Sequence, residues 1–300
     1  MRRFLSVFAA LLLSLPAGAQ DVGTLHPKPL PPLANPDDPH NAAKQVFGRL
    51  MTPTEAQSRS IGFYSKGCQT GAQALPLDGE SWKVMRVSRN RYWGQPETIA
   101  FLERFSKKAA DLGIWPGILV GDISQPRGGP MLTGHASHQI GLDADIWLTP
   151  MPANLTDKQR EDMSALDMVR EDGKAVNDNW SEKQAGIIRQ AAEESEVTLI
   201  FVNAAIKKAL CETHAGEPWM NKVRPWWGHN YHFHVRLRCP EGMASCENQA
   251  YKPPPGDGCD RSLDWWFSDE ALHPKPSKKP AQPLTMAQLP AACRTLAQEK

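Results

Sequence analysis

Long hydrophobic runs are scarce in this sequence of 300 residues. The most extended one, Phe4 to Leu15, is too short for a membrane-spanning helix, which needs about 20 apolar residues. Arg2 and Arg3 precede it, and the small residues Ala17-Gly18-Ala19 follow it. This order is typical of an export signal rather than of an N-terminal core helix, so we expect residues 1–19 to be a signal peptide. We expect no membrane span in the rest of the chain.

An excess of charge of either sign is also missing. The formal net charge is +1, and it becomes −1 without the two arginines of the expected signal peptide. Proteins that bind nucleic acids or anionic membranes usually carry a basic patch or stripe. The balance therefore gives no indication of a nucleic-acid partner or of an anionic membrane surface.

Two motifs that would indicate other chemistries are absent. No C-x-x-C pair supports a cysteine-based zinc site, and no G-x-S-x-G supports a nucleophilic serine.

An even number of cysteines in an exported chain favours three disulfides, for which 15 pairings are possible. Cys239 and Cys246 flank a short loop and could pair locally. The six cysteines are Cys68, Cys211, Cys239, Cys246, Cys259 and Cys293.

Proline is frequent at both ends of the chain. Residues 20–45 are rich in proline and aspartate without hydrophobic periodicity, so we expect an extended lead-in. Residues 273–300 form a proline-rich tail of similar composition, and Cys293 near its end is expected to tie it back to the body. The body of the protein is then residues 46–272.

Helix and strand patterns intermingle in this body without a regular βαβ rhythm, which favours an α+β fold. Helices are expected at residues 96–112, 183–194 and 203–212. Strands are expected at residues 82–87, 118–123, 142–148, 197–202 and 232–237.

Five of the nine histidines gather in two short segments, GHASHQIGLDADIW and WWGHNYHFHVRL. Residues two apart in a strand point to the same face, so His232 and His234 share one face of their strand. Asp143 and Asp145 share one face of another strand in the same way. Gly141 lets the preceding loop turn back, so that His138 can approach Asp145.

Two imidazoles and one carboxylate are a common ligand set of catalytic zinc, with one position left for water. Taken alone, H-x-H also fits an ordinary solvent-exposed strand face. Both segments together, in an exported protein, indicate a metal site.

The same segments resemble a known family. H-x6-D from His138 to Asp145, followed by H-x-H at His232 and His234, resembles the LAS metallopeptidases. The longer segments GHASHQ, KVRPWW, HVRLRCP and GDGC are similar to those of penicillin-insensitive murein endopeptidases. The resemblance extends from about Ser60 to about Cys293, which is most of the mature chain.

This resemblance implies a small antiparallel sheet with flanking helices and long loops, stapled by disulfides, in a metallopeptidase domain at residues 46–272. It also implies a periplasmic enzyme that cleaves D-alanyl–meso-diaminopimelyl crosslinks in peptidoglycan. Such an enzyme is insensitive to penicillin because it has no acylatable serine.

Carried over to this sequence, the resemblance also implies site residues. The zinc ligands that it implies are His138, Asp145 and His234. His232 would be the catalytic histidine, as a base for water or a stabiliser of the oxyanion, with His229 in support. His135 would belong to the metal site, in connection with a second ion. The implied disulfides are Cys68–Cys293, Cys211–Cys259 and Cys239–Cys246.

One departure concerns the second ion. The family can carry D-G-K-H, whereas this chain has Asp172-Gly173-Lys174-Ala175. Without the histidine we expect one zinc ion and do not expect Asp172 to be a ligand.

Several other residues are candidates for supporting roles. Trp226 and Trp227 could line a substrate groove or cover the site. Arg224 could pair with a substrate carboxylate or form a structural salt bridge, and Arg127 could reach the site from its loop. Asp143 could orient a histidine ligand.

Two alternatives to a murein endopeptidase stay open. One is a D,D-carboxypeptidase, or an L,D-cleaving enzyme, of the same superfamily. The other is a non-catalytic, zinc-bearing protein that binds peptidoglycan, although a purely structural zinc site would not require His232. The oligomeric state is not indicated by the sequence.

Overall fold

The computed structural model describes residues 22–250, 256–275 and 282–299. The expected signal peptide lies outside the described residues. Within them, no helix combines the length and the apolar character that crossing a membrane requires.

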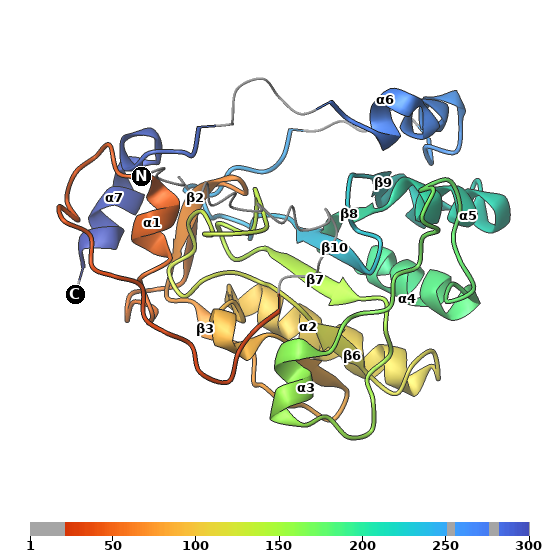
Figure 1. Ribbon diagram of the computed structural model, residues 1–300, viewed down its shortest axis with the longest axis horizontal. Coiled ribbons are helices and arrows are strands. Elements are labelled where there is room, and N and C mark those ends of the chain that lie inside the picture. The colour runs from red at the N-terminus through yellow and green to blue at the C-terminus, as the bar shows by residue number, and fades with distance from the viewer. Residues whose placement is uncertain (1–21, 251–255, 276–281, 300) are drawn as a thin grey trace, which may run out of the picture.

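A six-stranded sheet forms the centre of the molecule (Figure 1). In spatial order its strands are β4 (Trp82–Val84), β6 (Ile118–Val120), β7 (Asp143–Trp147), β10 (His232–Leu237), β8 (Val197–Val202) and β9 (Val223–Pro225). The three inner pairings are antiparallel, and the α+β class is confirmed. The outer pairs, β4 with β6 and β8 with β9, are parallel. The sheet is therefore mixed, whereas the resemblance had implied an antiparallel sheet.

The parallel pairs follow from the helices between their strands. α2 (Pro96–Asp111) lies in the chain between β4 and β6, and α5 (Ala204–His214) lies between β8 and β9. Parallel neighbours need a crossover connection of this kind, whereas antiparallel neighbours can be joined by a tight turn.

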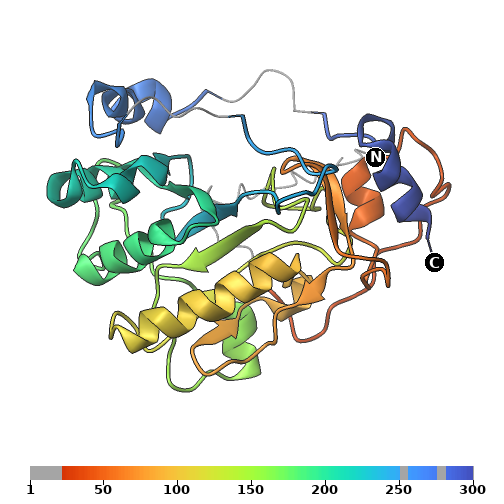
Figure 2. The ribbon, with the colours of Figure 1, turned by 180° about the vertical axis from the view of Figure 1, so that it is seen from behind.

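Two helices cover one face of the sheet. α2 begins at Pro96, where the fixed φ of proline suits the first helical position. α4 (Glu182–Glu193) begins with a capping box between Ser181 and Gln184. Both helices lie in front of the strands in Figure 2, where the molecule is seen from behind. The predicted helices at 96–112 and 183–194 are thereby confirmed.

Side-chain alternation in β7 and β10 separates a core face from a polar face. Ala144, Ile146, Phe233 and Val235 belong to the main hydrophobic cluster, together with apolar residues of α2 and α4. The alternate residues are Asp143, Asp145, Trp147, His232, His234 and Arg236, and they are also buried. The polar face is therefore covered by other parts of the chain, and the reading of H-x-H as a solvent-exposed strand face is wrong.

The two ends of the chain pack against each other. α1 (Ala43–Phe47) and α7 (Ala291–Gln298) lie side by side in Figures 1 and 2. Val46, Phe47, Met286 and Leu296 form part of a second apolar cluster with the Cys68–Cys293 disulfide. The sequence predicted the attachment of the tail but no helix at either end.

The remaining elements are short. β1 (Arg59–Phe63) and β2 (Lys66–Thr70) form a hairpin, and β3 (Gln73–Ala74) pairs with β5 (Trp93–Gly94). The short helices are α3 (Asp157–Asp162) and α6 (Asp269–Leu272).

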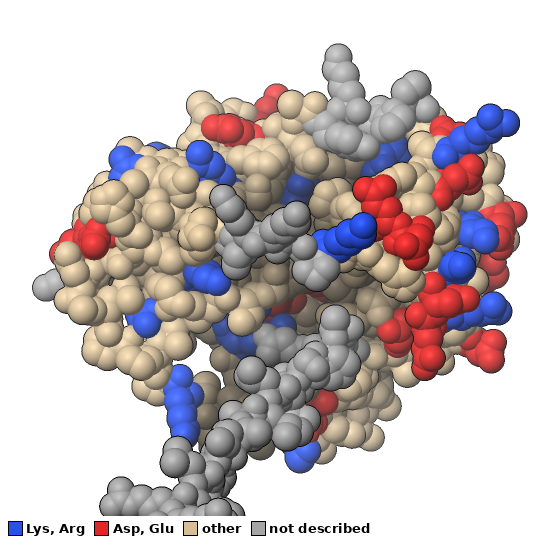
Figure 3. Space-filling view, turned by 45° about the horizontal axis from the view of Figure 1, so that its top comes forward, with Lys and Arg blue, Asp and Glu red and all other residues tan. Residues whose placement is uncertain are grey.

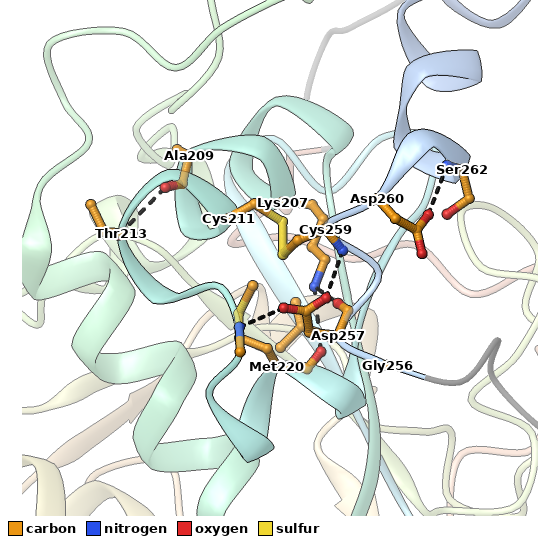
Figure 4. Close-up of a disulfide and its surroundings, with 12 residues drawn as sticks. Lys207, Ala209, Cys211, Thr213, Met220, Gly256, Asp257, Cys259, Asp260 and Ser262 are labelled. Atoms are coloured by element: carbon orange, nitrogen blue, oxygen red, sulfur yellow. Dashed lines mark hydrogen bonds between the residues drawn. A yellow bond between two sulfur atoms is a disulfide. The ribbon is translucent and has the colours of Figure 1, made fainter.

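All three expected disulfides are present. Besides Cys68–Cys293, they are Cys211–Cys259 and Cys239–Cys246. Cys211 lies on α5, so its bond ties the segment that begins at Gly256 to this helix (Figure 4). Three disulfides fit an exported protein. On the face shown in Figure 3, acidic and basic side chains lie next to one another beside large uncharged areas.

Candidate metal centre

The register of β7 and β10 brings the predicted ligands together. His234 lies directly opposite Asp145, and Arg236 lies opposite Asp143. Directly opposed residues in an antiparallel pair have Cβ atoms about 5 Å apart, close enough for two side chains to share one ion. Both strands thus contribute one ligand candidate at the same level of the sheet.

The loop before β7 contributes the third candidate, His138, which is fully buried. Its φ of +66° is unusual for a residue other than glycine, and such strain concentrates at functional sites. Gly141 also has positive φ, and a Cβ there would come within 1.9 Å of Gln69 Oε1. The backbone N–H of His138 donates to Asp143 Oδ2 at 2.9 Å, which holds the loop against the strand.

Three atoms form a nearly equilateral triangle. His138 Nε2 lies 3.2 Å from His234 Nδ1, and each of them lies 3.4 Å from Asp145 Oδ1. Tetrahedral zinc with bonds of about 2.0–2.1 Å separates its ligand atoms by about 3.3–3.4 Å. Among the described residues, Asp145 Oδ1 is also the one buried carboxylate oxygen without a hydrogen-bond partner. A divalent cation fits both observations.

The far side of each imidazole is held by another group. His138 Nδ1 lies 2.7 Å from the carbonyl oxygen of Ile123. His234 Nε2 lies 3.0 Å from Asp143 Oδ1, an ion-pair contact whose angle is not that of a hydrogen bond. Contacts of this kind fix the ring orientation of metal-binding histidines. They direct Nε2 of His138 and Nδ1 of His234 toward Asp145.

The protonation states suit a metal site. Burial lowers the pKa of His234 to about 4, and it also lowers the pKa of His232. Burial acts in the same direction on His138, but the Asp145 carboxylate outweighs it and raises the pKa of that ring. Burial would raise the pKa of Asp145, yet His232, His135 and His138 hold it well below its usual range. A metal requires neutral imidazoles and an ionised carboxylate, so a proton on His138 would be released on binding.

His135 offers a second way to complete the group. Single ligand atoms of His135, His138 and Asp145 all lie within 4.8 Å of one another, so these residues could hold a metal ion. However, His135 Nε2 is 3.0 Å from Asp122 Oδ2 and 3.3 Å from Asp145 Oδ2. It therefore lies between two carboxylates and contacts the oxygen of Asp145 that faces away from the triangle.

His232 and His229 lie beside the triangle. His232 Nε2 is 3.7 Å from Asp145 Oδ2, and its Nδ1 has no hydrogen-bond partner among the described residues. The His229 ring lies 4.9 Å from the His232 ring, and its Nδ1 is 2.8 Å from the carbonyl oxygen of Trp227. Partial burial lowers the pKa of His229 well below its usual value. Both rings are thus available as neutral imidazoles.

The site opens into a groove of about 520 Å³. The groove is lined by residues that include Phe201, Trp226, Trp227, His229, His234 and Arg236. A smaller recess contains Asp145 and His232, and His135 borders both spaces. The site can therefore be reached from outside while its ligand candidates stay buried.

Two arginines that the sequence suggested as site residues bind backbone carbonyl oxygens. Arg127 donates to the carbonyl oxygens of Thr52 and Leu296, and Arg224 donates to those of Val223 and Met220. Both therefore hold the backbone, because their guanidinium groups are engaged with carbonyl oxygens.

Sequence reasoning gave no site role to Asp122, which contacts His135. Arg91 and Arg89 pair with Asp122 at 2.9 and 3.1 Å. The sequence feature that could have indicated Asp122 is an aspartate near the end of an apolar strand. The ion pair between Asp143 and Arg236 was missed as well.

A buried triangle of two imidazoles and a carboxylate that opens into a groove is an arrangement typical of metal-dependent hydrolases. Residues 60–298 match the family described as penicillin-insensitive murein endopeptidase. The chain is 44% identical over 259 residues to the penicillin-insensitive murein endopeptidase of Klebsiella pneumoniae, covering 86% of this chain and 92% of that protein. It is 45% identical to that of Haemophilus influenzae, with coverages of 84% and 87%, and 41% identical to that of Escherichia coli, with coverages of 86% and 92%. The chain therefore belongs to this family of peptidases.

Proposed function

We propose that this chain is a periplasmic, zinc-dependent endopeptidase that cleaves D-alanyl–meso-diaminopimelyl crosslinks in murein. The observation that carries the proposal is the triangle of His138 Nε2, His234 Nδ1 and Asp145 Oδ1, with edges of 3.2 to 3.4 Å. We assign these three residues as the zinc ligands. His135 then orients Asp145 through its second oxygen, and its binding to a second ion stays a prediction.

The chemistry that a zinc ion supplies when bound is Lewis-acid activation of water and of the scissile carbonyl. Burial lowers the pKa of His232, which favours its neutral form. The ring lies beside Asp145, where its imidazole can accept a proton from the attacking water or stabilise the oxyanion. His229 contacts the His232 ring and supports its position. Asp143 fixes His234, and no serine is acylated, so β-lactams have no target in this mechanism.

The number of ions follows from the same residues. We propose one zinc ion per chain, because Ala175 stands where a histidine would be needed for a second. Asp172 accepts the backbone N–H of Lys174 within its own turn. The periplasm is proposed because its oxidising conditions permit three disulfides.

A digest of purified crosslinked muropeptide dimers tests the function. The mature protein is expected to convert dimers into monomers, to lose activity with a chelator, to regain it with zinc, and to ignore penicillin. Release of free D-alanine without monomers would instead indicate a carboxypeptidase. Binding of dimers without cleavage, in protein that contains zinc, would indicate a non-catalytic module.

A matched pair of variants makes this digest specific for the site. His138→Ala removes a proposed ligand and is expected to lower both zinc content and turnover. Asp172→Asn removes an exposed carboxylate and is expected to change neither. Full activity of His138→Ala would refute the ligand assignment.

A further inference from the structure

Four tryptophans form a cluster beside the groove of the metal site. Trp227 contacts the rings of Trp226, Trp265 and Trp266, with centroid distances of 5.6, 5.8 and 4.7 Å. Trp265 and Trp266 also contact each other at 5.3 Å. These residues come from two segments far apart in the sequence, so the cluster is a product of the fold.

The second segment of the cluster is anchored at several points. Trp265 and Trp266 lie on a 3₁₀ helix, Arg261–Phe267, which directly follows the Cys211–Cys259 disulfide (Figure 4). Asp260 caps this helix by accepting the backbone N–H of Ser262. The helix leads into α6 at the top of Figure 1. The disulfide therefore fixes where these two indoles can lie.

The first segment is joined to the second by a hydrogen bond. Trp227 Nε1 donates to the carbonyl oxygen of Ala271 at 3.0 Å, and the Trp227 ring packs against both indoles of the helix. Two rigid attachments, one covalent and one polar, thus hold the cluster in one arrangement.

The cluster is exposed although it is large and apolar. The exposed fractions of Trp226, Trp227 and Trp265 are 50%, 45% and 44%. A single exposed apolar side chain needs no explanation, but contiguous exposed aromatic rings mark binding surfaces. Trp also gives a wide contact area at a low entropic cost, because it has only two side-chain torsions.

Ring contacts connect the cluster to the metal site. Phe201 contacts the His234 ring at 5.3 Å and the Trp226 ring at 5.9 Å. Trp226 and Trp227 line the groove that contains His234, whereas Trp265 and Trp266 lie beyond it. A ligand on the cluster would therefore be continuous with a substrate in the groove.

We propose that this tryptophan cluster is a binding subsite for the glycan strand of murein. The proposal rests on the proposed function, since it names the part of the same polymer that lies next to the crosslink. A pyranose ring has a face of C–H groups that packs on a flat indole, while its hydroxyl groups stay at the rim. Arg261 and Asp264 are exposed on the same short helix and can bind such groups.

The dimensions of the substrate agree with this position. A stem of about four extended residues, at ~3.3–3.6 Å each, separates the crosslink from its sugar by ~14 Å at most. Ring contacts lead from His234 through Phe201 to Trp226 in steps of 5.3 and 5.9 Å, and a path of this length lies within the reach of such a stem.

The test compares crosslinked dimers that carry their disaccharides with dimers from which the sugars were removed enzymatically. The quantity compared is kcat/KM for the dimer with disaccharides divided by kcat/KM for the dimer without them. Trp265→Ala, in the zinc-loaded mature protein, is expected to lower this ratio at least fivefold. Trp265→Phe, which keeps an aromatic face, is expected to keep most of the wild-type ratio. Leu112→Ala, a change at the exposed residue that directly follows α2, is the control and should leave this ratio unchanged.

A binding assay separates this proposal from the proposed function. Peptide-free glycan strands are sedimented with the protein, and Trp265→Ala is expected to reduce the bound fraction at least fivefold. In the kinetic assay, an equal loss of kcat/KM on both dimer substrates in Trp265→Ala would show that the cluster contacts peptide. In the sedimentation assay, binding of Trp265→Ala to glycan strands at the wild-type level would also overturn the subsite. If the wild-type chain cleaved no dimer at all, the proposed function would fail, while sedimentation would still decide the subsite.

Discussion

Asp143 contacts two of the three proposed zinc ligands and an arginine. Its carboxylate is fully buried and contacts three groups: the backbone N–H of His138 at 2.9 Å, Nε2 of His234 at 3.0 Å and Nε of Arg236 at 2.8 Å. Burial would raise the pKa of Asp143, but Arg236 and His234 together hold it well below its usual range. The Asp143→Asn variant keeps the shape of the side chain and removes its charge.

Two effects of different size are expected. Removing one partner of a buried ion pair costs about 3–5 kcal/mol, because Arg236 would stay charged in a buried position. This is a third or more of the stability of many domains, which is about 5–15 kcal/mol. Losing a group that orients a metal ligand typically lowers metal affinity about 10–100-fold, here through His234.

Two measurements separate these effects. Urea unfolding of the metal-free protein gives the stability, and competition with a chromogenic chelator gives the zinc affinity. The double variant Asp143→Asn/Arg236→Met removes both charges and is expected to recover part of the lost stability but none of the lost affinity. A zinc affinity within threefold of wild type would refute the orienting role. A stability loss below about 1 kcal/mol would refute the compensated buried pair.

Three further predictions concern other parts of the molecule. His232→Ala is expected to keep about one zinc per chain by metal analysis while turnover of muropeptide dimers falls at least ~100-fold, since its imidazole handles protons and not the metal. Burial lowers the pKa of Lys207 from 10.5 to about 7. Above pH 7 the unfolded state therefore binds more protons than the folded state, so the free energy of unfolding should rise by about 2 kcal/mol between pH 7 and pH 9. This rise, measured by urea unfolding, should vanish in Lys207→Met and persist in a variant of the neighbouring exposed Lys208. Replacing Cys68 and Cys293 by serine removes a crosslink between residues 225 positions apart. This should lower the unfolding free energy by about 3–5 kcal/mol in the same assay. A loss below about 1 kcal/mol would show that the tail is held by packing alone.

Local patterns were enough to predict the strands that carry the site. Alternation in LDADIW and HFHVRL depends only on neighbouring residues, and both strands appear where they were expected. The same alternation put His232 and His234 on one face, together with Arg236. Helices α2 and α4 were equally predictable, since proline, serine and periodic apolar residues mark them locally.

Pairing between distant segments was not predictable from these patterns. The register that sets His234 opposite Asp145 depends on how two segments 89 positions apart are aligned, and a slip of one residue would move every side chain to the other face. The two parallel outer pairs depend on crossover helices in the same way. The resemblance to a family supplied the ligand set that spacing alone left open.

Contacts that cover the site were also beyond a local reading. Asp122 looked like the end of an apolar strand, and only the fold brings it to His135. Trp265 and Trp266 lie about 30 residues from the nearest site histidine, in a segment that pattern reasoning left without structure. A disulfide and one indole hydrogen bond bring them to the groove.

The arrangement of charge on the polar face supports the proposed position of the metal. Asp143 is matched by Arg236, and Asp122 is matched by Arg91 and Arg89. Asp145 contacts the imidazoles of His135, His138, His232 and His234. Its Oδ1 faces the rings of His138 and His234 and has no hydrogen bond among the described residues. Burying a carboxylate is costly unless it is paired, and imidazoles that are neutral give it less compensation than an arginine does. Among the described residues, Asp145 Oδ1 is a buried carboxylate oxygen without a hydrogen bond at the end of an accessible groove, and this supports the proposed position of the cation.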